Sequence, residues 1–293
     1  MIPLLLSCVA RAAPSPVAVV VSDELEAYRE PTDAFLSAFG GAPRVYTLHG
    51  RASEAAAVVA QLARTPPEVV VCVGAKAAYA VKNGLPGTTV VYASVLDPKR
   101  YGLTGDDVTG VTMAVDPVTY LSQFVGFFPE VRTIGVIRGP DTPDKRLLAM
   151  NAAAVEVDRD MLIARAEAPS DVRRQMNALA LQGADAVWLP PDRSILTTFG
   201  YRAIAEEARR RHLPLLVDTA SMVEAGGLFT MTPDPVGVGQ QTAALVQAIL
   251  DTGDVPRPQD PEVVQVVLNL RTIEAAELPF DRTMLDFADV VVR

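Results

Sequence analysis

Small or polar residues follow four hydrophobic segments that have the character of buried strands. In chain order, these strand ends lie at Ser22, at Gly74-Ala75-Lys76, at Ser94 and at Pro191-Asp192. Ligands of open parallel α/β sheets bind beyond the carboxyl ends of the strands, so these residues predict the lining of a binding cleft. Their hydroxyl, carboxylate, ammonium and backbone N–H groups suit the binding of a small polar ligand. They include no obvious catalytic set.

The segment that begins at Ala75 is predicted to open a helix directly after a strand. Unpaired N–H groups and the positive end of the helix dipole suit a carboxylate or a phosphate, although an ordinary helix start that faces water has the same pattern. Lys76 either adds a positive charge for an anionic ligand or is simply solvated. Ser94 either bonds to the ligand or caps its own loop.

Three further candidates lie near the same predicted strand ends. Ser22 ends the first strand, and Tyr28, close behind it, either stacks on a ligand ring or packs its helix against the surface. Asp97 precedes Pro98, and it either accepts from an ammonium group or starts a turn. The Asp-Pro pair favours the turn.

The second half of the chain contributes three charged candidates. Arg138 either clamps a carboxylate bidentately or forms a salt bridge with Asp141 or Asp144. Asp192 either binds the ligand or caps the helix that follows it. Asp218 follows a predicted strand and has the same two alternatives. The single tryptophan, Trp188, lies within a predicted strand, which favours a place in the core.

Composition and motifs exclude several classes of function. The 293 residues carry a formal net charge of −9, whereas nucleic-acid-binding proteins normally show a basic patch, so we expect no nucleic-acid partner. The two histidines and two cysteines have no metal-site spacing, and no serine–histidine triad is expected. No glycine-rich phosphate loop follows a strand. We therefore expect no metal, no cofactor and no enzymatic activity.

The first residues resemble the end of a secretory signal peptide. Leu4–Leu6 form an apolar core, and Ala10-Arg11-Ala12 is a small-x-small cleavage pattern, so residues 1–13 are interpreted as a signal-peptide remnant. The alternatives are lipid attachment at Cys8, whose preceding residues resemble a lipobox, and a short N-terminus of a cytoplasmic protein. We expect the mature protein to be periplasmic or otherwise extracytoplasmic, and either free or tethered through Cys8.

Strand-like and helix-like segments alternate from Val17 onward and start a second series after Pro129. This alternation predicts an α/β fold with two doubly wound, parallel-sheet lobes. Within it we expect helices capped by Ser53 and Ser170, and one long helix over Ser194–Arg211.

Three segments carry a family resemblance. They are Gly110-Val111-Thr112 with the following helix and Ile134–Ile137, the run Ala184–Asp192 with Leu213-Pro214-Leu215, and Val267–Arg271 with Leu278-Pro279 and Leu285–Asp289. In this order and spacing, the chain resembles the ABC-transporter substrate-binding family that includes the tryptophan- and tyrosine-binding proteins, which have the type I periplasmic binding fold. The resemblance extends from Val17 to the C-terminus.

The resemblance implies two lobes joined by hinge crossings, with a ligand held between them. The N-terminal lobe is expected to comprise residues 14–123 and 233–260, and the C-terminal lobe residues 124–232 and 261–293. Asp97-Pro98 and Pro191-Asp192 match family positions, whereas Ala75 replaces the family's threonine and has Lys76 beside it. The expected partners are a small, anionic or amino-acid-like ligand and an ABC-transporter permease in the membrane.

We therefore predict the extracytoplasmic solute-binding component of an ABC importer. The alternative is a sensor of the same fold that presents its ligand state to a membrane receptor or kinase. A doubly wound, nucleotide-dependent enzyme is disfavoured because the phosphate loop is missing.

Overall fold

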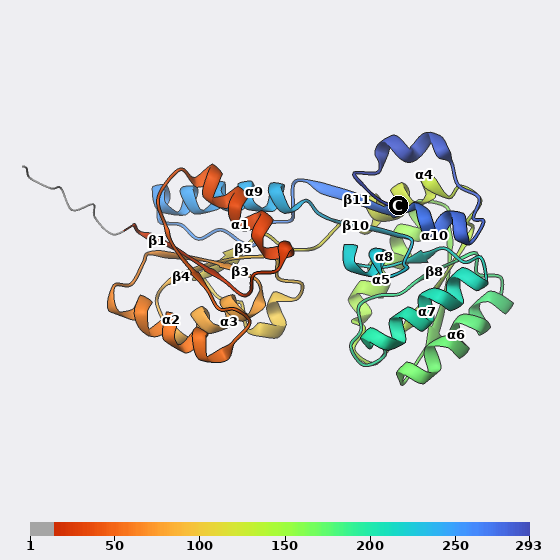
Figure 1. The fold of residues 1–293 in the computed structure, drawn as a ribbon, viewed down its shortest axis with the longest axis horizontal. Helices are drawn as coiled ribbons and strands as arrows, with labels where there is room; N and C mark the ends of the chain where they lie inside the picture. The colour runs from red at the N-terminus through yellow and green to blue at the C-terminus, as the bar shows by residue number, and fades with distance from the viewer. Residues whose placement is uncertain (1–14) are drawn as a thin grey trace, which may run out of the picture. The chain divides into compact units, whose positions relative to one another are not determined.

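A computed structural model describes residues 15–293, which form two compact units (Figure 1). Unit 1 combines the chain up to Met113 with Pro235–Glu262, and unit 2 combines Ala114–Asp234 with Val263–Arg293. The predicted signal-peptide remnant and Cys8 lie outside the described residues. The chain therefore passes between the units at three points, as the hinge-crossing prediction requires.

Unit 1 contains a parallel sheet in the order β2-β1-β3-β4-β5. Its strands are β1 (Val17–Val21), β2 (Arg44–Thr47), β3 (Val69–Val73), β4 (Thr89–Ala93) and β5 (Val108–Gly110). Every residue of β1 and β3 is buried, which explains why these strands read as continuous valine-rich runs rather than alternating ones.

Helices cover both faces of the unit 1 sheet (Figure 1). The helices are α1 (Glu26–Phe39), α2 (Ala52–Arg64), α3 (Ala75–Gly84), the short 3-10 helix η1 (Pro98–Tyr101) and α9 (Pro235–Thr252). Helices α2 and α3 share a core with one face, whereas α1 and α9 share a core with the other. Gly239 of α9 lets the two helices approach closely, since a Cβ there would lie 2.4 Å from the Pro31 carbonyl oxygen.

Unit 2 contains a mixed sheet in the order β12-β11-β10-β9-β8-β6-β7. Its strands are β6 (Thr133–Arg138), β7 (Asp160–Arg165), β8 (Ala186–Trp188), β9 (Leu215–Leu216), β10 (Phe229–Pro233), β11 (Val264–Asn269) and β12 (Val290–Val292). The sheet is mainly parallel, as expected, and departs from that pattern at one pair: β10 and β11 are antiparallel. The chain leaves unit 2 after β10 and returns into β11, so the two strands run in opposite directions.

The unit 2 sheet is also covered on both faces. Its helices are α4 (Pro117–Phe127), α5 (Asp144–Glu156), α6 (Pro169–Leu181), α7 (Thr198–Arg210), α8 (Ala220–Glu224), α10 (Leu270–Ala275) and the 3-10 helix η2 (Arg282–Phe287). Helices α4, α5 and α10 share a core with one face, and α6, α7 and α8 with the other. Trp188 is fully buried, which confirms its predicted place in the core.

Three expectations about helix starts are wrong. Helix α2 begins one residue before Ser53, with no side-chain cap. Helix α6 begins at Pro169, where Asp171, rather than Ser170, accepts from the Glu167 and Ala168 amides. The expected helix over Ser194–Arg211 begins only at Thr198, capped by Thr197.

The units divide at positions that differ from the expected lobe boundaries. The divisions fall after Met113, Asp234 and Glu262, rather than after residues 123, 232 and 260. The first difference has a physical reason, because α4 packs on the sheet of unit 2. The Tyr120 and Phe124 rings lie 5.3 and 5.5 Å from the ring of Phe229 in β10. Within residues 15–293, no helix has both the length and the apolar character needed to span a membrane.

Candidate ligand-binding site

In unit 1, the carboxyl ends of β1, β3 and β4 meet at one edge of the sheet, because these strands are parallel neighbours. Ser22 follows β1 and is buried, with its amide donating to the Val73 carbonyl at 2.9 Å. Its Oγ accepts from the amide of Ala77 in the first turn of α3, at 3.0 Å. Ser22 therefore joins the strand ends to the helix start, and its hydroxyl proton remains available for donation.

Tyr28 approaches the same edge from α1, next to Gly74. Gly74 has φ +88°, and a Cβ there would lie 2.6 Å from Ser22 Oγ and 3.0 Å from Tyr28 Cε1. Burial raises the pKa of the Tyr28 phenol, and the charge of Asp23 and the neighbouring Tyr101 raise it further. The phenol therefore stays protonated at neutral pH and can donate a hydrogen bond.

The start of α3 and Lys76 form the part of this edge that suits an anion. Ser22 engages the Ala77 amide, which leaves the amides of Ala75 and Lys76 as candidate donors. The exposed Lys76 donates from Nζ to the Gly50 carbonyl at 3.0 Å. The ammonium is therefore held beside the edge by a neutral backbone acceptor, and the Asp23 carboxylate lies next to the same glycine.

The remaining unit 1 candidates occupy the loop after β4. Ser94 has φ +56°, a left-handed conformation that is uncommon outside glycine and often marks a functional loop. Asp97 accepts from the Arg100 amide at 3.3 Å and caps η1, which confirms the turn that the Asp-Pro pair predicts.

In unit 2, β9, β8 and β6 are adjacent parallel strands, followed by Asp218, Asp192 and the loop after Arg138. Asp192 is 3% exposed and accepts from the Thr142 hydroxyl at 2.7 Å, the Ser194 amide at 2.9 Å and the Ser194 hydroxyl. Burial by itself raises the pKa of Asp192, but these hydrogen bonds outweigh it and the pKa is lowered. Asp192 is thus a charged, structurally engaged carboxylate, and it caps no helix directly.

Asp218 belongs to a second cluster, with Arg146 and Trp188. Its buried carboxylate pairs with the Arg146 guanidinium and accepts from Trp188 Nε1 at 3.3 Å. The Arg146 guanidinium carbon lies 5.7 Å from the centroid of the Trp188 ring. Burial raises the pKa of Asp218 despite these two partners. Because Arg146 is 44% exposed, the cluster presents a cation rather than a carboxylate to solvent.

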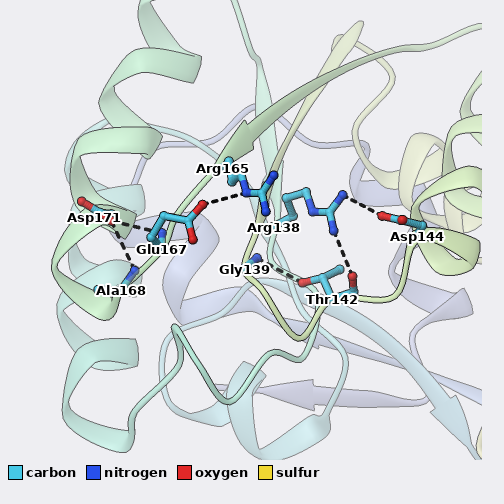
Figure 2. A network of polar contacts seen from close by, with 8 residues as sticks. All are labelled: Arg138, Gly139, Thr142, Asp144, Arg165, Glu167, Ala168 and Asp171. Carbon is cyan, nitrogen blue, oxygen red and sulfur yellow. Dashed lines mark hydrogen bonds and ion pairs between the residues drawn. The ribbon is translucent and has the colours of Figure 1, made fainter.

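Arg138 forms one of the two ion pairs expected for it. Its Nη1 donates to Asp144 Oδ1 at 2.7 Å, and Nη2 donates to the Thr142 carbonyl at 3.3 Å (Figure 2). The neighbouring strand ends in Arg165, which pairs with Glu167 at 2.7 Å. Thr142 therefore connects Arg138 to Asp192, through its carbonyl and its hydroxyl respectively.

Other features of the described residues do not add to these two edges. A cavity of about 290 Å³ is lined by Leu270, Arg271, Glu274 and Arg293. These residues follow or flank the ends of β11 and β12, which run antiparallel to β10 and so end at the opposite edge of the sheet. Among residues 15–293, no group of three His, Cys, Asp or Glu side chains is arranged to hold a metal ion.

A comparison with known protein families identifies the kind of protein that carries these two sheet edges. The sequence profile described as ABC transporter substrate binding protein matches residues 44–292. The chain belongs to this family. Its members are solute-binding proteins rather than enzymes, and they typically act outside the cytoplasm. No protein with a curated description matches the sequence.

Solved structures of low sequence identity share the fold. A ligand-free, open substrate-binding protein with adhesive properties from Clostridium difficile has a TM-score of 0.78 at 15% identity, over 94% of this chain and 98% of that one. A conserved domain protein from Vibrio cholerae has 0.66 at 20%, over 95% and 100%. An ABC domain from Streptococcus pneumonia in complex with L-Trp has 0.64 at 17%, over 94% and 100%. The fold of this family member is therefore the two-lobe type I periplasmic binding protein fold.

Two residues of the unit 2 edge were missed by sequence reasoning. Arg146 pairs with Asp218 across 72 residues, and Thr142 bonds Asp192 across 50. Arg146 lies within α5 and Thr142 lies in the loop after β6, and no motif in the sequence singled them out. They became visible only when β6, β8 and β9 were placed side by side.

Proposed function

We propose that this family member binds one small solute outside the cytoplasm and delivers it to an ABC-transporter permease. The family match over residues 44–292 carries the proposal. Each unit supports it with a polar sheet edge, at Ser22, Lys76 and Ser94 in unit 1 and at Arg138 and Asp218 in unit 2. The solute undergoes no covalent change.

We further propose that the solute is anionic or amino-acid-like. In unit 1, the support comes from the α3 amides and the Lys76 ammonium, which both favour a negative group. In unit 2, Asp218 is already paired with Arg146, so the exposed charge of that cluster is positive. The complement of these charges is a carboxylate or a phosphate.

A thermal-shift screen tests the binding claim. Amino acids, organic acids, phosphonates and nucleosides are added to the purified protein, and a solute at 100 times its Kd is expected to stabilise the fold by about 2.7 kcal/mol. Lys76→Met is then expected to weaken an anionic hit about tenfold. Arg64→Met, in the last turn of α2, serves as the matched control, because that end of α2 lies at the opposite edge of the same sheet. An equal loss in both variants contradicts the proposed site.

The transporter partner needs its own measurement. The liganded protein is expected to stimulate ATP hydrolysis by its permease–ATPase complex in proteoliposomes, and the ligand alone is not. A protein that binds its solute and leaves hydrolysis unchanged contradicts delivery to that transporter, and the sensor alternative then gains support.

A further inference from the structure

Two arginines end neighbouring strands of unit 2 in register. Arg138 of β6 and Arg165 of β7 are Cα partners in a parallel pair, so their side chains leave the same face of the sheet. Figure 2 shows the two guanidinium groups adjacent, between Glu167 and Asp144. Neighbouring strands lie about 4.8 Å apart. One compact group can therefore contact both guanidiniums.

The carboxylates that now neutralise these arginines are held weakly. Asp144 and Glu167 have side chains that are 78% and 64% exposed, whereas Arg138 is only 23% exposed. Exposed ion pairs contribute little to stability, because water solvates the separated charges almost as well. Asp171 adds no third counterion, since it accepts from the Glu167 and Ala168 amides and pairs with Arg174.

Arg138 also has a hydrogen-bonding capacity that the fold does not use. Its Nη1 and Nη2 are engaged by Asp144 and Thr142, but Nε is buried and finds no acceptor within the part of the chain described. A buried N–H without a partner is unfavourable, and a guanidinium binds an oxyanion best through two parallel N–H groups. An incoming anion that replaces Asp144 would let the fork turn and use Nε as well.

We propose that Arg138 and Arg165 form a subsite for a phosphate or phosphonate group of the transported solute. Asp144 and Glu167 are the counterions that this group displaces. The inference rests on the proposed function and deepens it by naming the substrate class. A tetrahedral dianion fits better than a single carboxylate, because it supplies two charges and three acceptor oxygens to two guanidiniums.

Calorimetric titration of the full-length protein with inorganic phosphate and with methylphosphonate, at fixed low ionic strength, tests the subsite. Acetate is the singly charged comparison and is expected to bind at least tenfold more weakly. Arg138→Met and Arg165→Met are each expected to weaken phosphate binding about tenfold, because each removes a charge-assisted contact. Asp144→Asn and Glu167→Gln are expected to tighten it several-fold, because each removes a competing anion.

The matched controls come from an exposed ion pair elsewhere in unit 2. Arg209 pairs with Glu206 at the end of α7, three residues apart. Arg209→Met and Glu206→Gln are therefore expected to leave phosphate binding unchanged. The arginine variants are expected to weaken phosphate binding and the carboxylate variants to tighten it. A variant that merely unfolds cannot give the expected tightening.

Each remaining outcome has a distinct meaning. Absence of phosphate binding, or binding unaffected by Arg138→Met and Arg165→Met, overturns the subsite. If an amino acid or an organic acid without a phosphoryl group binds in the same screen, the proposed function stands without the subsite. If no solute of any class binds, both fail. Sedimentation with phosphatidic acid vesicles separates the two sources of a phosphoryl group: binding to vesicles without binding to free phosphate overturns assignment to a free solute.

Discussion

Asp192 and Asp218 follow adjacent strands of one sheet, yet their surroundings shift their pKa values in opposite directions. Hydrogen bonds from Thr142 and Ser194 outweigh burial at Asp192 and lower its pKa. Burial outweighs Arg146 and Trp188 at Asp218 and raises its pKa. Three hydrogen bonds reach Asp192 and favour its charged form, whereas desolvation prevails at Asp218. The two residues have the same side chain but different capacities to take up a proton.

The raised pKa of Asp218 predicts a pH-dependent signal from the single tryptophan. The native state holds the Asp218 proton more strongly than the unfolded chain does. The stability that this proton contributes is fully present below the ordinary value of 3.8 and is lost as pH rises through the folded pKa. Since Trp188 donates to this carboxylate, its fluorescence is expected to titrate above pH 3.8 in the native protein.

A pair of variants checks this assignment. Asp218→Asn is expected to remove the transition, whereas Asp254→Asn, an exposed carboxylate of unit 1, is expected to leave it in place. A transition that persists in Asp218→Asn would show that another group titrates beside Trp188. A transition below pH 3.8 would contradict the direction of the shift.

At the scale of elements, the turn from β3 into α3 depends on a single glycine. Gly74 has φ +88° and ψ 158°, a region that is essentially restricted to glycine. The same turn places Ser22 and Tyr28 against the glycine, where no Cβ fits. The positions of the Ser22 hydroxyl, the Tyr28 ring and the start of α3 therefore all depend on this glycine.

Substituting this glycine is expected to be costly. Gly74→Ala combines backbone strain of about 1–3 kcal/mol with the clash against Ser22, so we expect a loss of at least ~2 kcal/mol in the free energy of unfolding. Gly87→Ala is the matched control, since Gly87 also has a positive φ, +82°, but no atom lies within 4 Å of its Cβ position. Urea denaturation of both variants makes the comparison. Equal losses in the free energy of unfolding would show that backbone strain alone, and not packing against Ser22 and Tyr28, makes glycine necessary at position 74.

The sequence predicts elements better than their ends. Short valine runs indicate β1 and β3, because a strand covered on both faces needs consecutive apolar residues and β-branched residues favour strands. Helix starts are harder, because serine competes with other capping groups: Asp171, two residues into α6, took the role assigned to Ser170. Strand β12, which pairs with β11 near the end of the chain, was not foreseen.

The candidate site shows the same limit more strongly. Residues that end strands, such as Ser22 and Asp218, are found from periodicity, because the strand edge itself predicts their place. The residues that form ion pairs or hydrogen bonds with them cannot be found in this way. Arg146 lies within α5 and reaches Asp218 only through the packing of that helix on the sheet. The sequence therefore predicts which side chains reach the edge, but not which of them neutralise one another.

At the scale of the whole molecule, the two units depend differently on residues 235–262, which complete unit 1 and interrupt unit 2 in the sequence. Unit 1 is completed only by α9, which supplies Ala243, Leu245, Val246 and Ile249 to the core shared with α1 and β3. The segment that contains α9 interrupts the sequence of unit 2. The residues on either side of this segment are hydrogen-bonded, since the Asp234 amide donates to the Val263 carbonyl at 3.0 Å. The ends of the interruption are therefore already paired, as in a hairpin. Unit 2 has all of its own core without residues 235–262.

This pairing predicts that unit 2 folds alone when the interruption is replaced by a tight turn. In a chain of residues 114–234 and 263–293 joined by Asn-Gly, Asp234 and Val263 become the closing pair of a two-residue hairpin, for which Asn-Gly is the preferred turn. We expect cooperative urea unfolding, with Trp188 buried in the native state. Residues 15–113 alone are the control and are expected to lack a cooperative transition, because one face of their sheet has lost α9. A joined unit 2 that fails to fold would show that contacts with unit 1 are required for its stability, whereas a cooperative fold of residues 15–113 would show that α1 alone suffices to cover that face.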